Sequence, residues 1–155
     1  MRMSLEKSRN HLKKYNLDDN IIILSSSSAT VMDASESLGV TPGEIAKSLS
    51  FIVSGKPILI VASGSARIDN AKFKNTFKEK ANMIKGERVE ELIGHAVGGV
   101  CPFGVNDGVD VYLDESLKQY DVVYPASGSS NSCVKLTIKE LERASNYKNW
   151  VDVTK

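Results

Sequence analysis

The sequence predicts an α+β protein in which a mixed β-sheet is flanked by helices within a single domain. The first observation is the length of 155 residues, which is the size of one typical domain. The second is that strand-like and helix-like segments are interspersed along the chain. The third is that hairpins or short loops join several predicted strands, which favours a mixed sheet over a purely parallel one.

The first forty-odd residues alternate between helix and strand patterns. Residues 4–15 place apolar side chains on one helical face, and residues 31–38 repeat this spacing, with Gly39 positioned to end the second helix. Between them, Ile21–Leu24 is a β-branched run of strand length. In Thr41–Glu44 a capping threonine, a proline at the first helical position and a glutamate three residues after the threonine predict a short helix.

The clearest hairpin pattern follows this short helix. Residues 48–53 and 57–62 are both predicted strands, and Ser54–Lys56 supplies the turn between them. Asp69 is placed to cap the next helix, which is predicted to end at about Phe77.

The second half contains a long segment without a regular pattern. A helix is predicted at Glu87–Ile93 and ends at Gly94, and residues 94–108 then contain five glycines and one proline. The remaining predicted elements are a strand at 109–113, a helical turn at 114–120, strands at 122–126 and 133–136, a helix from a capping box at 137–140 to residue 144, and an edge strand at 150–153.

Composition excludes several classes of protein. Lys and Arg number 20 against 19 Asp and Glu, so the net charge of +1 excludes a strongly basic nucleic-acid coat, although not a local basic face. The two cysteines are too few for a disulfide framework and are typical of free thiols in a reducing compartment. No stretch approaches the ~20 apolar residues of a membrane-spanning helix, and residues 1–16 lack the apolar core of a signal peptide. We expect a soluble, cytoplasmic protein without a membrane partner.

Two segments are candidates for binding a substrate. Gly94–Gly104 is rich in glycine, so its main-chain N–H groups could bind a carbonyl, carboxylate or phosphate, although composition alone favours an ordinary surface loop. Lys47 stands among apolar residues where the short helix meets a strand. There it could bind a phosphate or a carbonyl oxygen, although a lysine extended along the surface is the commoner case.

A thiol mechanism is an alternative to main-chain binding. Cys101 and His95 are close enough in sequence to form a thiolate–imidazole pair, but no third orienting residue is evident. The two cysteines and two histidines lack the spacing of a zinc site. We therefore expect neither a metal nor a cofactor.

Three motifs, in this order, resemble the YbaK/prolyl-tRNA synthetase editing-domain family. They are Ser37–Val40 followed by Ile45–Leu49, then Val97–Gly104, then Ala126–Gly128 followed by Val134–Leu136 and a capped helix. The resemblance spans residues 20–145, preceded by an N-terminal helix within residues 1–16. It identifies the whole chain, 1–155, as one editing domain.

This resemblance implies hydrolysis of the ester between a wrong amino acid and its tRNA, often a tRNA for proline, by a protein with a barrel-like mixed sheet. Lys47 falls on the family's essential lysine, and Gly98–Pro102 on its Gly-x-x-x-Pro loop, whose main chain orients the ester and a water molecule. The implied catalytic residues are Lys47, Gly98, Gly99, Val100, Cys101 and Pro102, and the implied substrate-binding residues are Ser48, Phe103, Gly104 and Gly128. No metal or cofactor is required.

The resemblance leaves the substrate open. Cysteine-specific members have an acidic residue near the position of Cys133 and an aromatic one near Ser25, and this chain has neither. Alanine, cysteine, serine and threonine all stay open as the amino acid removed. The expected partners are the acceptor end of an aminoacyl-tRNA and, as a further partner, an aminoacyl-tRNA synthetase. The competing hypotheses are a thiol hydrolase using Cys101 and His95, and a non-catalytic module that binds tRNA or a synthetase.

Overall fold

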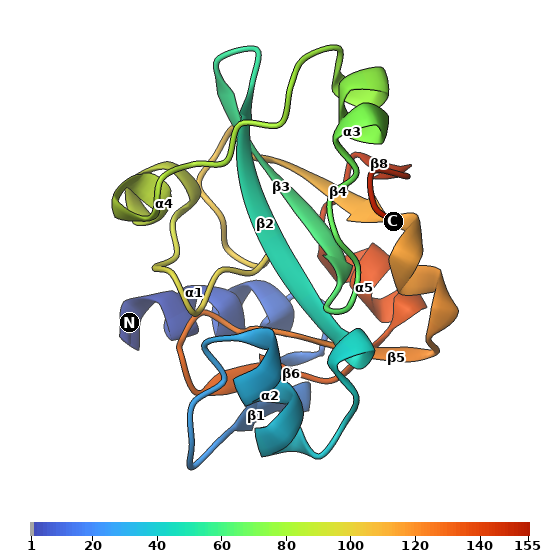
Figure 1. Ribbon diagram of the computed structural model, residues 1–155. Helices are drawn as coiled ribbons and strands as arrows, with labels where there is room; N and C mark the ends of the chain where they lie inside the picture. Colours follow the sequence, from blue (N-terminus) through green and yellow to red (C-terminus); the bar gives the residue numbers. More distant parts are fainter. Residues whose placement is uncertain (1) are drawn as a thin grey trace.

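Two long antiparallel strands, β2 (Ile45–Val53) and β3 (Lys56–Ser63), form the centre of the molecule (Figure 1). Ser54 and Gly55 form the two-residue turn between them. Both have positive φ, 52° and 76°, which matches the turn to the right-handed twist of the strands. The hairpin predicted from the sequence is confirmed. However, β2 begins three residues earlier than predicted, so Lys47 lies inside the strand and not at its junction with a helix.

The computed structural model describes residues 2–155, with side chains described from Ser4 onward. Six strands form one curled, mixed sheet in the order β7-β5-β2-β3-β4-β8, and β1 pairs with β6 in a separate two-stranded sheet. The remaining strands are β1 (Ile21–Ile23), β4 (Asp110–Asp114), β5 (Val122–Pro125), β6 (Ser132–Val134), β7 (Leu136–Thr137) and β8 (Asn149–Val151). The predicted α+β single domain with a barrel-like mixed sheet is therefore confirmed.

Within residues 2–155, five α-helices surround the sheet (Figure 1). They are α1 (Arg2–Lys13), α2 (Val31–Leu38), α3 (Asn70–Phe77), α4 (Gly86–Ile93) and α5 (Ile138–Ala144), with short 3₁₀ turns at Asp18–Asn20, Pro42–Glu44 and Glu115–Gln119. The side chains of Thr30, Asp69 and Thr137 cap α2, α3 and α5 by accepting main-chain N–H bonds. Gly39 and Gly94 end α2 and α4 in the left-handed conformation.

Three sequence predictions need correction. The N-terminal helix ends at Lys13 and not at residue 15, and Asn16 then adopts a positive φ of 60°. The single strand predicted at 133–136 is two strands in different sheets, because Lys135 turns aside and its N–H donates to Asn20 O at 3.1 Å. The last strand is Asn149–Val151 and not 150–153, although it does lie at an edge of the sheet, as predicted. Residue 1 of the predicted N-terminal helix lies outside the described residues.

Apolar side chains cover both faces of the central strands. On one face Leu59 and Val61 of β3 belong to a cluster that includes residues of α1, α4 and α5. On the other face Phe51 packs on Phe73 of α3, with ring centroids 4.9 Å apart. Burial on both faces explains why β3 is a nearly continuous apolar run and not an alternating one.

Two loops pack against helix α1 so closely that only glycine fits at the points of contact. A Cβ at Gly128 would lie 2.3 Å from Ser4 O, and one at Gly104 would lie 2.8 Å from Lys7 O. Gly104 N–H donates to His11 Nδ1 at 3.1 Å. Loops 98–104 and 127–130 therefore rest directly on α1.

These approaches generate a stability prediction. We expect Gly128→Ala to lower the free energy of unfolding by about 2–5 kcal/mol, because both the left-handed strain and the overlap with α1 must be accommodated. Gly108 has a nearly equal φ, +90° against +94°, with nothing within 4 Å of an added Cβ. Gly108→Ala should therefore cost only the strain, about 1–2 kcal/mol. Urea unfolding of both variants measures the difference, and equal losses would contradict the close approach.

Candidate functional site

A cavity of about 300 Å³ lies along β2 at the place where one edge of that strand has no neighbour. The parallel ladder between β2 and β5 ends at Ala46–Pro125. The next main-chain bond on this edge is from Ile84 N–H to Ser50 O, at 3.1 Å. Between these two points, residues 47–49 border the cavity.

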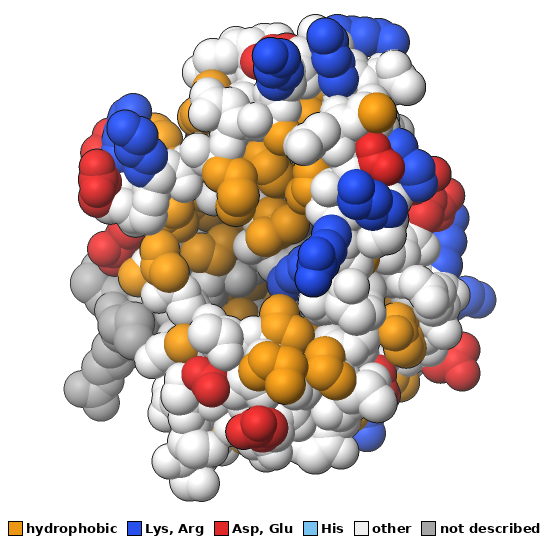
Figure 2. Space-filling view, in the orientation of Figure 1, with side chains coloured by type: hydrophobic (Ala, Val, Ile, Leu, Met, Phe, Trp, Pro, Cys, Tyr) orange, Lys and Arg blue, Asp and Glu red, His pale blue; other side chains and the backbone are white. Residues whose placement is uncertain are grey.

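The walls of the cavity are mainly apolar and come from four parts of the chain. Figure 2 shows a hollow on this face that is lined by hydrophobic side chains. Opposite β2 stand Ala29–Val31 at the start of α2, Val89 of α4, and Val97, Gly98 and Val100 of the glycine-rich loop. Tyr124, Ala126 and Cys133 complete the lining near β5 and β6.

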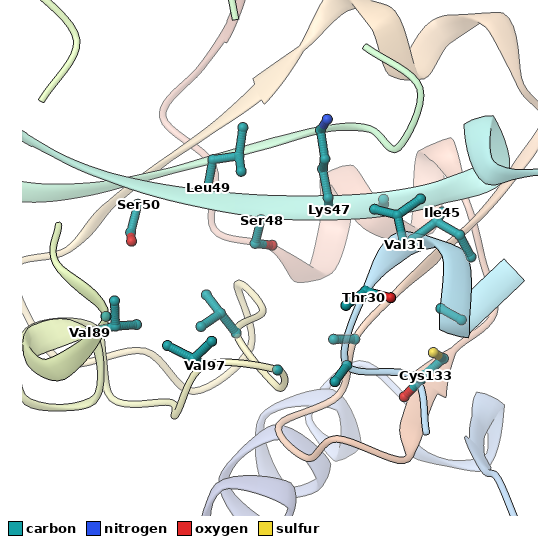
Figure 3. Close-up of a pocket in the computed structure, with 18 of the residues that line it drawn as sticks. Thr30, Val31, Ile45, Lys47, Ser48, Leu49, Ser50, Val89, Val97 and Cys133 are labelled. Atoms are coloured by element: carbon teal, nitrogen blue, oxygen red, sulfur yellow. The ribbon is translucent and has the colours of Figure 1, made fainter. Parts of the chain in front are cut away.

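Lys47 and Ser48 leave β2 on opposite faces. In Figure 3, Ser48 and Ser50 point toward the side of Val97, whereas Lys47 and Leu49 point away from it. Lys47 Nζ donates to Gly64 O at 3.4 Å and also to Ala66 O. An ammonium group has three N–H donors, so one of them stays free for a ligand.

The environment of Lys47 weakens its hold on a proton. Partial burial lowers the pKa of Lys47 below its usual value, and the nearby positive charge of Arg67 lowers it further. The two carbonyl oxygens of Gly64 and Ala66 hold the ammonium group on the face of β2 that points away from Val97.

Two serine hydroxyls in the cavity walls have no hydrogen-bond partner among the described residues. Ser28 Oγ and Ser48 Oγ are both buried and unpaired. Leaving a hydroxyl unpaired in an apolar wall costs free energy, and most buried polar groups avoid it. A polar group of a bound ligand, or a water molecule, would remove this cost.

Two residues of the glycine-rich loop, Gly98 and Val100, line the cavity. The N–H groups of Gly98 and Val100 find no main-chain acceptor within residues 2–155. Gly98 has a φ of +97°, so this turn of the loop favours glycine. The structure thus brings Lys47, Ser48, Gly98 and Val100 together at one cavity.

The other predicted site residues support the loop from behind. A Cβ at Gly99 would lie 2.5 Å from the carbonyl carbon of Gly128, and Gly128 N–H donates to Gly99 O at 3.0 Å. Pro102 and Phe103 are buried, and Phe103 packs near His11 with ring centroids 5.8 Å apart. As described above, Gly104 and Gly128 rest on α1. None of these residues borders the cavity.

Cys101 and His95 do lie together, but away from the cavity. Cys101 Sγ is 3.5 Å from His95 Nε2, and the same nitrogen lies 2.7 Å from Phe103 O. Both side chains have no exposed surface. Burial raises the pKa of the Cys101 thiol to about 12 and lowers the pKa of His95. This arrangement does not generate a thiolate in reach of a substrate.

Sequence reasoning missed the apolar walls of the cavity. Ala29–Val31 and Val89 belong to no motif, Val97 is only the first residue of one, and an apolar residue in a sequence is usually assigned to the core. The structure leaves Val97 64% exposed and Met83 56% exposed beside the cavity. Among the described residues, no group of three or more His, Cys, Asp or Glu could hold a metal ion.

Comparison with known proteins gives a consistent result. The aminoacyl-tRNA editing domain family matches residues 25–144. The uncharacterized protein YwhH of Bacillus subtilis (strain 168) is 49% identical over 154 residues, covering 99% of this chain and 98% of YwhH. A proline–tRNA ligase of Lactiplantibacillus plantarum is 25% identical over 125 residues, which are 80% of this chain but only 22% of that ligase.

A solved structure extends the comparison to three dimensions. It is the crystal structure of a protein proposed as a trans-editing enzyme for prolyl-tRNA synthetase. It is 29% identical to this chain, has a TM-score of 0.87, and the match covers 98% of this chain and 97% of the other. In the part of the chain that the structure describes, no helix is long and apolar enough to cross a membrane.

The burial of both cysteines generates a prediction about their reactivity. With a pKa of about 12, only about one Cys101 thiol in ten thousand is ionised at pH 8. Burial also raises the pKa of Cys133, which is 1% exposed. We expect no measurable labelling by iodoacetamide at pH 8 in the native protein, and labelling of both thiols in urea. Mass spectrometry measures the labelling. Rapid labelling of Cys101 in the native protein would contradict the prediction and support the thiol mechanism.

Proposed function

The chain belongs to the aminoacyl-tRNA editing domain family, and on this basis we propose that it hydrolyses the ester joining a wrong amino acid to its tRNA. The products are the free amino acid and the uncharged tRNA. The observation that carries the proposal is the pair of unpaired N–H groups, from Gly98 and Val100, at a cavity that also contains Lys47. The tRNA for proline is the first candidate, because relatives include proline–tRNA ligases.

The two main-chain N–H groups of the loop would stabilise the transition state. When water attacks the ester carbonyl, negative charge develops on its oxygen, and donors already held in place stabilise that charge. Gly98 and Val100 supply such donors without any side chain. The hydrogen bond from Gly128 N–H to Gly99 O helps to hold the loop in this shape.

Lys47 would position the substrate. Lys47 lines the cavity, and its ammonium group is held by two carbonyl oxygens on the face of β2 that points away from Val97, with one N–H donor left. That donor suits an oxygen of the terminal adenosine or of the aminoacyl carbonyl. Fixing the ester against the loop removes much of the entropic part of the barrier.

Water is the nucleophile in this proposal, and the ribose hydroxyl beside the ester assists it. An aminoacyl ester is already an activated bond, so positioning and charge stabilisation supply the acceleration required. Cys101 has no part in the reaction, because its thiol is buried and lies outside the cavity.

The size of the cavity favours a small amino acid such as alanine, cysteine, serine or threonine. A volume of about 300 Å³ must hold the side chain and part of the terminal nucleotide together. The walls formed by Val31, Ile45 and Tyr124 belong to the helix and strands that frame the cavity, so they exclude larger side chains by shape. The acceptor end of the tRNA is the partner, and the cytoplasm, where tRNA is charged, is the expected compartment.

The first test concerns Lys47. We expect Lys47→Ala to slow deacylation about 10²-fold, because the substrate loses a fixed cation. Lys56→Ala is the matched control, since Lys56 is exposed on β3 and forms only a 3.7 Å ion pair with Asp110. The measurement is single-turnover deacylation of tRNAs charged with alanine, cysteine, serine or threonine. If the wild type turns over none of them, the non-catalytic binding module replaces this proposal, and unchanged turnover by Lys47→Ala overturns the role of this lysine.

The second test concerns the N–H groups of the loop. A Cβ at Gly98 would lie 3.4 Å from Ala29 Cβ, which is ordinary contact, so the substitution strains φ and displaces the donors without a severe overlap. We expect Gly98→Ala to slow deacylation by about 10²–10³, whereas Gly108→Ala, with similar strain, keeps the wild-type rate. Cys101→Ala should stay within about tenfold of the wild type.

Gly99→Ala is not an equivalent test. Its Cβ would overlap the main chain of Gly128 and Ser129, so this variant should lose stability as well as activity. Thermal melts measured beside the rates separate the two effects. An inactive Cys101→Ala together with an active Gly98→Ala would overturn the main-chain mechanism.

A further inference from the structure

Four basic residues form a continuous run that begins at the cavity, and we name them the basic rim: Lys47, which lines the cavity, and beyond it Arg67, Lys155 and Lys72. Lys47 Nζ donates to the carbonyl oxygens of Gly64 and Ala66, which places it beside Arg67. The main chains of Arg67 and Lys155 pair in both directions, at 3.1 and 2.8 Å. Lys72 Nζ donates to Thr154 O at 2.8 Å.

The positive charge of the basic rim is only partly neutralised. Lys72 pairs with Asp152 at 3.1 Å, and the carboxylate of Asp69 is occupied in capping α3. Lys47 and Arg67 form no ion pair within residues 2–155, and Arg67 is exposed. An exposed guanidinium next to a fixed ammonium is a suitable site for phosphate oxygens.

The helices on the other two sides of the cavity carry mainly acidic side chains, although none of these carboxylates lines the cavity. Helix α2 contains Asp33 and Glu36 and no basic residue. Helix α4 contains Glu87, Glu90 and Glu91 against a single Arg88. In Figure 2 blue side chains are the more numerous to the right of and above the hollow, with some red ones among them, whereas red side chains stand below it and, beside one blue group, to its left.

From this asymmetry we propose that the ribose–phosphate backbone of the bound RNA leaves the cavity over the basic rim and not across α2 or α4. The proposal rests on the proposed function, because it takes the acylated 3′ end of an RNA as the occupant of the cavity. Phosphates repel the acidic sides and are attracted to the basic one, and a net charge of +1 leaves no general attraction to compete with this local field.

The short length of the basic rim sets the expected strength of binding. Each single-strand phosphate that is neutralised contributes about −0.7 to the slope of log affinity against log salt concentration. The four cations of the rim therefore predict a shallow slope of about −2 to −3. A slope of about −6 or steeper would show a much larger basic surface and overturn the proposal.

The experiment measures binding of uncharged tRNA by fluorescence anisotropy over a range of salt concentrations. We expect Arg67→Ala to weaken binding about three- to tenfold and to make the slope shallower by about 0.7, the loss of one phosphate contact. Arg88→Ala is the matched control, because Arg88 is also an exposed arginine but lies on acidic α4, next in sequence to the lining residue Val89. Its binding should stay within about twofold of the wild type. An equal or larger loss in Arg88→Ala, or no loss in Arg67→Ala, overturns the proposed path.

Deacylation assays separate this proposal from the proposed function. With charged tRNA, Arg67→Ala should raise KM and leave kcat unchanged, and with aminoacyl-adenosine, which has no phosphate backbone, it should behave like the wild type. If tRNA binds over the basic rim but is never deacylated, the proposed function fails and the path stands. If charged tRNA is deacylated and Arg67→Ala has the same KM as the wild type, the proposed function stands and the proposed path fails.

Discussion

The cavity depends on one interruption in the pairing of β2. Strand β5 accompanies β2 only to Ala46, and the segment around Ile84 pairs with it again only at Ser50. A fully paired strand would bury its N–H and C=O groups against a neighbour, leaving no room for a ligand there. The interruption leaves three residues of a rigid central strand open at one edge. Lys47 and Ser48 therefore stand on a stiff element, which holds functional groups more accurately than a loop does.

The opposite wall is the glycine-rich loop, which has no regular secondary structure but is fixed in position by contacts between main chains. Gly99 packs on Gly128, and Gly128 packs on Ser4 of α1. This stack transmits the position of α1 to the N–H groups of Gly98 and Val100, although α1 lies outside residues 25–144 that match the editing family. A side chain anywhere in the stack would push the loop away from β2. Gly99 and Gly128 are thus required because the main chains approach so closely. Gly98 differs from them, because it lines the cavity and has a positive φ.

Local features of the fold could be predicted from the sequence, and non-local ones could not. The β2–β3 turn and the caps of α3 and α5 follow from residues within a few positions of one another, so their patterns were sufficient. The division of residues 132–137 between two sheets depends on partners more than ten residues away. The resemblance gave Gly98–Pro102 as one functional unit. The structure divides it, because alternate residues of the loop face the cavity and the interior.

The chemistry of the cavity is limited by what lines it. Its titratable residues are Lys47, Tyr124 and Cys133, and the described lining contains no carboxylate and no histidine. A site of this kind has no ordinary general base near neutral pH, so it suits a reaction whose substrate is already activated. An aminoacyl ester meets that condition, and a peptide or amide bond, which is far less reactive, does not. Under the proposed function, the rate would depend on the shape of the loop and on the fixed ammonium of Lys47, because neither contribution needs a proton to move through a side chain.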